Sequence, residues 1–120
     1  MRNNLAIILL MCLFLASCGT TTTVKKIGAR AYPAKPAGCD IAIYKDEKPN
    51  TTFSVIGQID SHIKKNIFWG GVAQLDDEGY KELKKKACQL GGDAVVIDDY
   101  MESTAAELTH VHIWATVIKF

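Results

Sequence analysis

The pattern of hydrophobic and polar positions divides the chain into three parts. Residues 5–16 are almost wholly apolar, residues 19–37 are polar and show neither a helical nor a strand period, and the remainder alternates in short periodic segments. Such a pattern predicts an N-terminal apolar segment, a flexible linker that cannot bury enough apolar surface to fold, and one small domain.

The first half of the domain contains two predicted strands. Residues 39–44 are short and rich in apolar side chains, and residues 45–52, with Pro49 and Asn50, are typical of a turn. Apolar residues at alternate positions over residues 53–63 predict the second strand, in which Gly57 marks a bulge or a close backbone contact. We expect residues 64–75 to form a loop.

A helix is predicted over residues 76–90. Its apolar side chains recur at spacings of three and four residues and so form one stripe. Asp76 or Asp77 is a candidate N-cap, and the pair Gly91-Gly92 is a typical stop signal. The stripe consists of Tyr80, Leu83, Ala87 and Leu90.

Two further strands follow the helix. Residues 93–97 form a buried strand, residues 98–109 a loop or hairpin, and residues 110–117 alternate between apolar and polar side chains, as in a strand with one buried face. The order strand, strand, helix, strand, strand predicts an α+β fold, an antiparallel sheet of about four strands with one helix packed on a face.

The apolar N-terminal segment has the form of an export signal. It follows Arg2, suits the apolar part of a signal peptide and is too short to span a bilayer as a helix. It ends in Leu15-Ala16-Ser17-Cys18, which looks like the lipobox that directs lipid onto the cysteine. The alternative is a buried N-terminal helix with an incidental cysteine.

These features predict three parts: a signal peptide over residues 1–17, a lipidated cysteine and flexible tether over residues 18–38, and the domain over residues 39–120. Gly19, not Asp, follows the cysteine. By analogy with Gram-negative sorting, this predicts a protein anchored in the outer membrane through acyl chains such as palmitate, with its domain in the periplasm.

Two cysteines remain once the signal peptide and the lipidated residue are set aside. Cys39 and Cys88 form an even pair in an oxidising compartment, so we expect a disulfide between them. The alternative is two separate thiols, one of them buried.

Charge and motifs exclude several function classes. Removal of Arg2 with the signal peptide reduces the 14 basic residues to 13, against 13 acidic ones, and such a balance argues against nucleic-acid binding. The sequence has no phosphate loop, dinucleotide fingerprint or nucleophile elbow. We therefore expect neither an enzyme nor a cofactor, and we assign the carboxylates of Asp98 and Asp99 to a strand end.

Two sets of residues are candidate binding sites. His110 and His112 project from one face of a strand and are weak candidate metal ligands, which His62 and Asp60 would supplement if their strands were neighbours. The simpler interpretation is a pair of polar residues on a solvent face. Phe68 and Trp69 form either a partner contact or a lid on the small core.

The segment Ala87-Cys88-Gln89-Leu90-Gly91-Gly92-Asp93-Ala94-Val95-Val96 resembles the helix-to-strand turn of YbjQ-type domains. Val55-Ile56-Gly57-Gln58-Ile59 resembles their preceding strand. The arrangement of lipobox, tether and domain is similar to that of RcsF-type outer-membrane lipoproteins, which sense envelope stress. The resemblance covers about residues 39–100 and implies the same small α+β domain.

The leading expectation is a non-enzymatic interaction or sensor protein of the cell envelope, held at the membrane by lipid on Cys18 and contacting another envelope protein. The alternatives are a metal- or small-ligand-binding module and a structural homo-oligomer.

Overall fold

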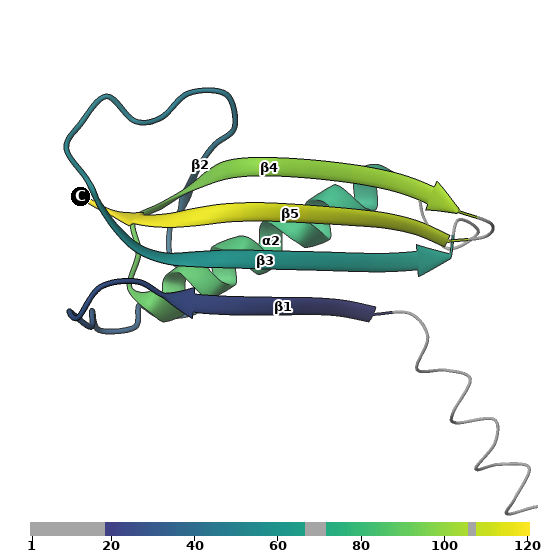
Figure 1. The fold of residues 1–120 in the computed structure, drawn as a ribbon. Coiled ribbons are helices and arrows are strands. Elements are labelled where there is room, and N and C mark those ends of the chain that lie inside the picture. The colour runs from purple at the N-terminus through teal and green to yellow at the C-terminus, as the bar shows by residue number, and fades with distance from the viewer. Residues whose placement is uncertain (1–18, 67–71, 106–107) are drawn as a thin grey trace, which may run out of the picture.

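The computed structural model describes residues 19–66, 72–105 and 108–120, which form a mixed sheet with one helix across one face (Figure 1). The sheet has five strands in the order β1-β3-β5-β4-β2. The predicted α+β class is confirmed. The elements are β1 (Gly19–Lys26), β2 (Ala42–Tyr44), β3 (Ser54–Asn66), α2 (Val72–Leu90), β4 (Ala94–Ala105) and β5 (Leu108–Lys119).

The sheet is not wholly antiparallel, contrary to the sequence-based expectation. The pairs β1–β3, β3–β5 and β4–β5 are antiparallel, whereas the short strand β2 pairs parallel to β4, with Ala42 opposite Ala94. Parallel neighbours need a crossover rather than a tight turn. Here β3 and α2 lie between β2 and β4 in the chain, so periodicity within each segment could not reveal the pairing.

The prediction of a flexible tether is wrong for Gly19–Lys26, which form β1 at the edge of the sheet. Almost every residue of β1 is exposed, so the strand shows no alternation of apolar and polar residues. Its four consecutive threonines are β-branched and favour the extended backbone, and its partner supplies the ladder of hydrogen bonds. The sheet therefore includes Gly19–Lys26, which precede the expected domain boundary at residue 39.

Other boundaries also differ from the sequence-based prediction. The strand β3 continues to Asn66, the helix begins at Val72, and β4 runs through the predicted loop to Ala105. Asp76 and Asp77 consequently lie inside the helix and do not cap it. The extension of β4 carries mostly exposed side chains, so pairing with β5, and not burial, defines it. Between β3 and the helix, residues 67–71 of the loop that was expected over residues 64–75 lie outside the described residues.

The helix ends where the glycine pair predicted. Gly91 has a φ of 76°, its N–H donates to the carbonyl of Cys88, and the N–H of Gly92 donates to the carbonyl of Ala87. This is the double hydrogen-bond pattern of a Schellman cap. A Cβ on Gly91 would lie 2.4 Å from the carbonyl oxygen of Pro33, so the linker segment packs directly against the end of the helix.

Gly57 serves two purposes, as the sequence indicated. The register between β3 and β5 shifts between Val55 and Gly57, which identifies a bulge. A Cβ at position 57 would lie 2.7 Å from Cδ1 of Leu90, so the missing side chain admits the end of the helix.

The main core lies between α2 and the sheet. Leu83 and Ala87 of the predicted stripe are fully buried, and Tyr80 and Leu90 pack at the margin. The predicted inward face of β5 is confirmed, because its alternate residues are all buried. These residues are Val111, Ile113, Ala115 and Val117.

Within the described part of the chain, the opposite face of the sheet is covered only at one end. Ala94, Val96 and Ile118 form a second buried cluster, against which Tyr44 and Phe53 pack. These positions alternate with those of the main core, so they belong to the other face. Further along β3 and β5 this second face carries half-exposed polar and aromatic side chains.

Candidate functional site

Three imidazole rings lie together on the face that α2 does not cover. They come from His62 of β3 and from His110 and His112 of β5, and the chain has three histidines in all. The two strands are neighbours, with His62 opposite His112. The sequence predicted that His62 and Asp60 would supplement His110 and His112 if their strands were neighbours, and the strands are neighbours.

The rings form a row along the sheet. His62 Nε2 and His110 Nδ1 are 3.0 Å apart and share one hydrogen bond, in which one ring donates and the other accepts. The centroid of His62 lies 5.3 Å from that of His110 and 5.2 Å from that of His112. His112 in turn stacks on Trp114, with centroids 3.7 Å apart. His62 is therefore the central ring of the group.

Asp60 holds one ring in place. Its carboxylate Oδ1 accepts a hydrogen bond from His112 Nε2, so in the neutral imidazole the proton lies on that nitrogen. The other ring nitrogen, Nδ1, then keeps its lone pair. A carboxylate in this position fixes both the tautomer and the orientation of an imidazole.

The environment favours a neutral His62. Burial lowers the pKa of His62 below its ordinary value of 6.5, and the neighbouring His112, His110 and Lys64 lower it further, with Asp60 acting in the opposite direction. A lowered pKa leaves the ring uncharged at neutral pH, with one nitrogen lone pair available as an acceptor or a ligand.

A hollow of about 460 Å³ borders the row beside Trp114. It combines an aromatic ring with a lysine ammonium group, two carboxylates and side-chain hydroxyl and amide groups. Its side chains come from four strands, and β1 contributes two of them. The lining residues are Thr23, Lys25, Gln58, Ile59, Asp60, Asp98, Trp114 and Ala115.

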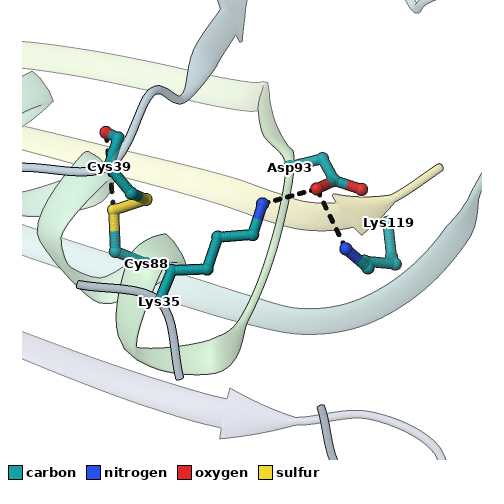
Figure 2. The surroundings of a disulfide bond; sticks show 5 residues. All are labelled: Lys35, Cys39, Cys88, Asp93 and Lys119. Atoms are coloured by element: carbon teal, nitrogen blue, oxygen red, sulfur yellow. Dashed lines mark hydrogen bonds and ion pairs between the residues drawn. A yellow bond between two sulfur atoms is a disulfide. The ribbon is translucent and has the colours of Figure 1, made fainter. Parts of the chain in front are cut away.

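A disulfide lies at the C-terminal end of the helix (Figure 2). It joins Cys39, which precedes β2, to Cys88 in the last turn of α2, with their Cα atoms 6.0 Å apart. The Cys88 side chain is buried although it lies beside the apolar stripe of the helix. The bond ties the segment before β2 to the helix.

Near the disulfide, Asp93 connects the start of β4 to the segment before β2 and to the C-terminal end of β5 (Figure 2). Its carboxylate accepts hydrogen bonds from Lys35 Nζ at 2.6 Å, Lys119 Nζ at 3.0 Å and the backbone N–H of Phe120 at 2.8 Å. Burial by itself would raise the pKa of Asp93, but these donors outweigh burial and lower it to about 2. The group is a structural junction, because three donors already occupy the carboxylate.

Asp76 also has a structural role. Its Oδ1 accepts a hydrogen bond of 2.6 Å from the hydroxyl of Tyr100, which joins α2 to β4. Burial and then this bond raise the pKa of Tyr100.

Several candidate residues lie outside the described part of the chain. Cys18, Phe68 and Trp69 are among them, so the lipid anchor and the aromatic contact remain predictions. Trp114 was not singled out from the sequence, although its alternation with His110 and His112 already placed it on their face.

Two features are absent from the described residues. No three His, Cys, Asp or Glu side chains there are arranged as a complete metal site. In the same residues, no helix is both long enough and apolar enough to cross a bilayer.

Comparison with known proteins shows a likeness in fold. No protein-family model matches the chain, and no curated protein matches it significantly. The chain is similar in structure to a Francisella virulence factor, FvfA, with a TM-score of 0.58 and 16% identity over 81% of this chain and 97% of that one. At this identity the likeness shows a shared fold.

Proposed function

We propose that the protein is a lipid-anchored, non-enzymatic interaction protein of the bacterial outer membrane, with a sensor role of the kind that its resemblance to RcsF-type lipoproteins implies. The observation that carries the proposal is the uneven covering of the sheet. One face is sealed by α2, whereas the other presents a row of aromatic rings beside a hollow. Aromatic side chains around a partly polar depression are typical of protein contact sites.

The position of β1 determines which end of the sheet a lipid on Cys18 would hold at the membrane. The strand begins at Gly19, one peptide unit or about 3.8 Å from the Cα of Cys18. Gly19 is opposite Lys64, near the end of β3, and the same end of the sheet carries the start of α2 and the β4–β5 hairpin (Figure 1). With lipid on Cys18, this end lies next to the membrane and the histidine row points sideways from it.

In this arrangement the length of the sheet, and not a long flexible tether, sets how far the domain extends from the membrane. The 12 residues of β5 span about 40 Å. The sheet itself therefore carries the far end of the open face away from the bilayer, and a partner meets that face in a fixed orientation.

The test is photo-crosslinking in living cells. A crosslinking amino acid replaces Met101, which is 52% exposed and opposite His112 on the open face. The matched control replaces Gln89, which is exposed on α2. We expect one envelope protein to be captured from position 101 and not from position 89.

Equal capture from both positions, or capture of this protein alone, would contradict the proposal. The second result would favour the homo-oligomer. The anchor is tested separately, because Cys18→Ala should abolish incorporation of radiolabelled palmitate and release the protein from the membrane fraction.

A further inference from the structure

The histidine row has a feature that partner contact does not require. His62 and His110 are 48 residues apart in the sequence, yet their ring nitrogens lie 3.0 Å from each other on a half-exposed face. Two nitrogens bound to one zinc ion at 2.0–2.1 Å in tetrahedral geometry are about 3.3 Å apart. The observed separation is therefore close to that of two ligands of one metal ion.

We propose that His62 and His110 form a binding site for a divalent transition-metal ion of the zinc and copper class, with His112 as a third ligand. Imidazole nitrogen is a preferred ligand of both metals. The site goes beyond the proposed interaction role and does not depend on it.

In the metal-free protein one proton lies between His62 Nε2 and His110 Nδ1. For both nitrogens to bind a metal, the donor ring must change tautomer, so that its proton moves to the other nitrogen of the same ring. That nitrogen then needs an acceptor, which water can supply because both residues are half-exposed. Loss of one hydrogen bond is thus exchanged for two metal–nitrogen bonds, at no change in the charge of either ring.

The third ligand is set by Asp60. Its carboxylate holds the proton of His112 on Nε2, which leaves Nδ1 free as the metal-binding atom. A carboxylate behind a ligand histidine is the usual outer partner of such an imidazole. Because no three His, Cys, Asp or Glu side chains of the described residues are placed to hold one metal ion together, His62 and His110 are the two direct ligands. His112 joins them only by a shift of its ring that keeps the Nε2–Asp60 hydrogen bond, and water fills the remaining positions.

An open site of this kind predicts moderate affinity. Two or three imidazoles on a pair of strands should bind zinc far more weakly than the four protein ligands of a closed structural site. Copper(II) should bind more tightly than zinc, in keeping with the general order of divalent affinities.

The experiment is isothermal titration calorimetry of the mature protein in detergent with Zn²⁺ and, separately, with Cu²⁺. We expect one metal per chain. His62→Ala and His110→Ala should each weaken zinc binding at least 10-fold, and Asp60→Asn should weaken it about 10-fold, because loss of an outer partner typically costs 10- to 100-fold.

Thr116→Ala is the matched control, since Thr116 lies on the same face of β5 but bonds to Asp98 outside the row. Its affinity for zinc should be unchanged. Melting curves of every variant without metal show whether the fold is kept, and imidazole nitrogen NMR of the wild-type protein supplies a readout that needs no variant.

Three results would overturn the proposal. They are no binding heat at 100 micromolar metal, binding that persists in the His62→Ala, His110→Ala double variant, or imidazole resonances that do not move on addition of zinc. None of them bears on the crosslinking test at Met101, so the two proposals fail independently.

Discussion

At the scale of single residues, Asp93 joins parts of the chain that are far apart in the sequence. Lys35 precedes β2, Asp93 precedes β4, and Lys119 ends β5. The carboxylate is 21% exposed, so solvent weakens these ion pairs only in part. Asp93 contributes to stability by joining the segment that precedes Cys39 to the segment that follows Cys88.

Asp93→Asn should therefore lower the free energy of unfolding at neutral pH by about 1–2 kcal/mol, a discounted figure for a partly exposed group. Because the pKa of Asp93 is lowered from 3.8 to about 2 in the folded state, the unfolded chain takes up the proton first as the pH falls. The contribution of Asp93 is complete above about pH 4 and is lost towards about pH 2.

Urea denaturation at several pH values measures this contribution. The difference between wild type and Asp93→Asn should shrink as the pH falls through that window, whereas Asp46→Asn, at an exposed position in the turn, should change nothing. A difference that stays constant from pH 7 to pH 2 would contradict the assignment.

Alanine substitutions at two glycines distinguish the free-energy cost of a strained backbone from the cost of a steric clash. Gly91 and Gly28 both have positive φ, at 76° and 84°, but a Cβ meets the carbonyl of Pro33 at position 91 and nothing within 4 Å at position 28. Gly28→Ala should cost about 1 kcal/mol and Gly91→Ala roughly 3 kcal/mol of unfolding free energy. Equal losses in thermal denaturation would mean that the linker does not pack on the helix end.

At the scale of elements, β1 is a weakly buried part of the sheet. It is an edge strand with nearly every side chain exposed, and its side-chain contacts with β3 include one hydroxyl pair, Thr22 with Ser61 at 3.4 Å. Local stability follows the burial of apolar contacts, and β1 has few of them. By contrast, β5 lies between two partners and buries one complete face.

Hydrogen exchange should show this difference directly. We expect the amides of β1 to exchange at least 100-fold faster than those at the centre of β5, since they open without unfolding the core. Mass spectrometry of the native mature protein gives both rates in one experiment. Equal protection of the two strands would show that β1 unfolds only with the whole domain.

At the scale of the whole molecule, a small domain depends on its covalent link. The disulfide closes a loop with a sequence separation of 49, which corresponds to roughly 4 kcal/mol of stabilisation in the chain-entropy model. For a domain of this small size, this is a large share of the total stability.

Reduction with dithiothreitol should therefore lower the urea midpoint strongly in wild type. The Cys39→Ser, Cys88→Ser double variant should start near the reduced midpoint and show no response to the reductant. A wild-type midpoint that is insensitive to reduction, with thiols shown to be free, would mean that packing of Cys88 alone holds this region.

The sequence by itself determined the features that depend on near neighbours in the chain. Spacings of three and four residues placed Leu83 and Ala87 on the buried face of a helix, Gly91 marked its end, and alternation placed the inner face of β5. Local backbone geometry dictates these patterns, so a single segment contains the whole signal. The α+β class follows from the order of such segments.

Only the tertiary structure decided which segments meet. An edge strand such as β1 draws its stability from a partner's backbone, so it needs no apolar pattern and leaves none in the sequence. The parallel pairing of β2, and the meeting of His62 with His110 across 48 residues, likewise depend on strand order. Periodicity identifies the face on which a side chain lies, but strand order alone determines which side chains share that face.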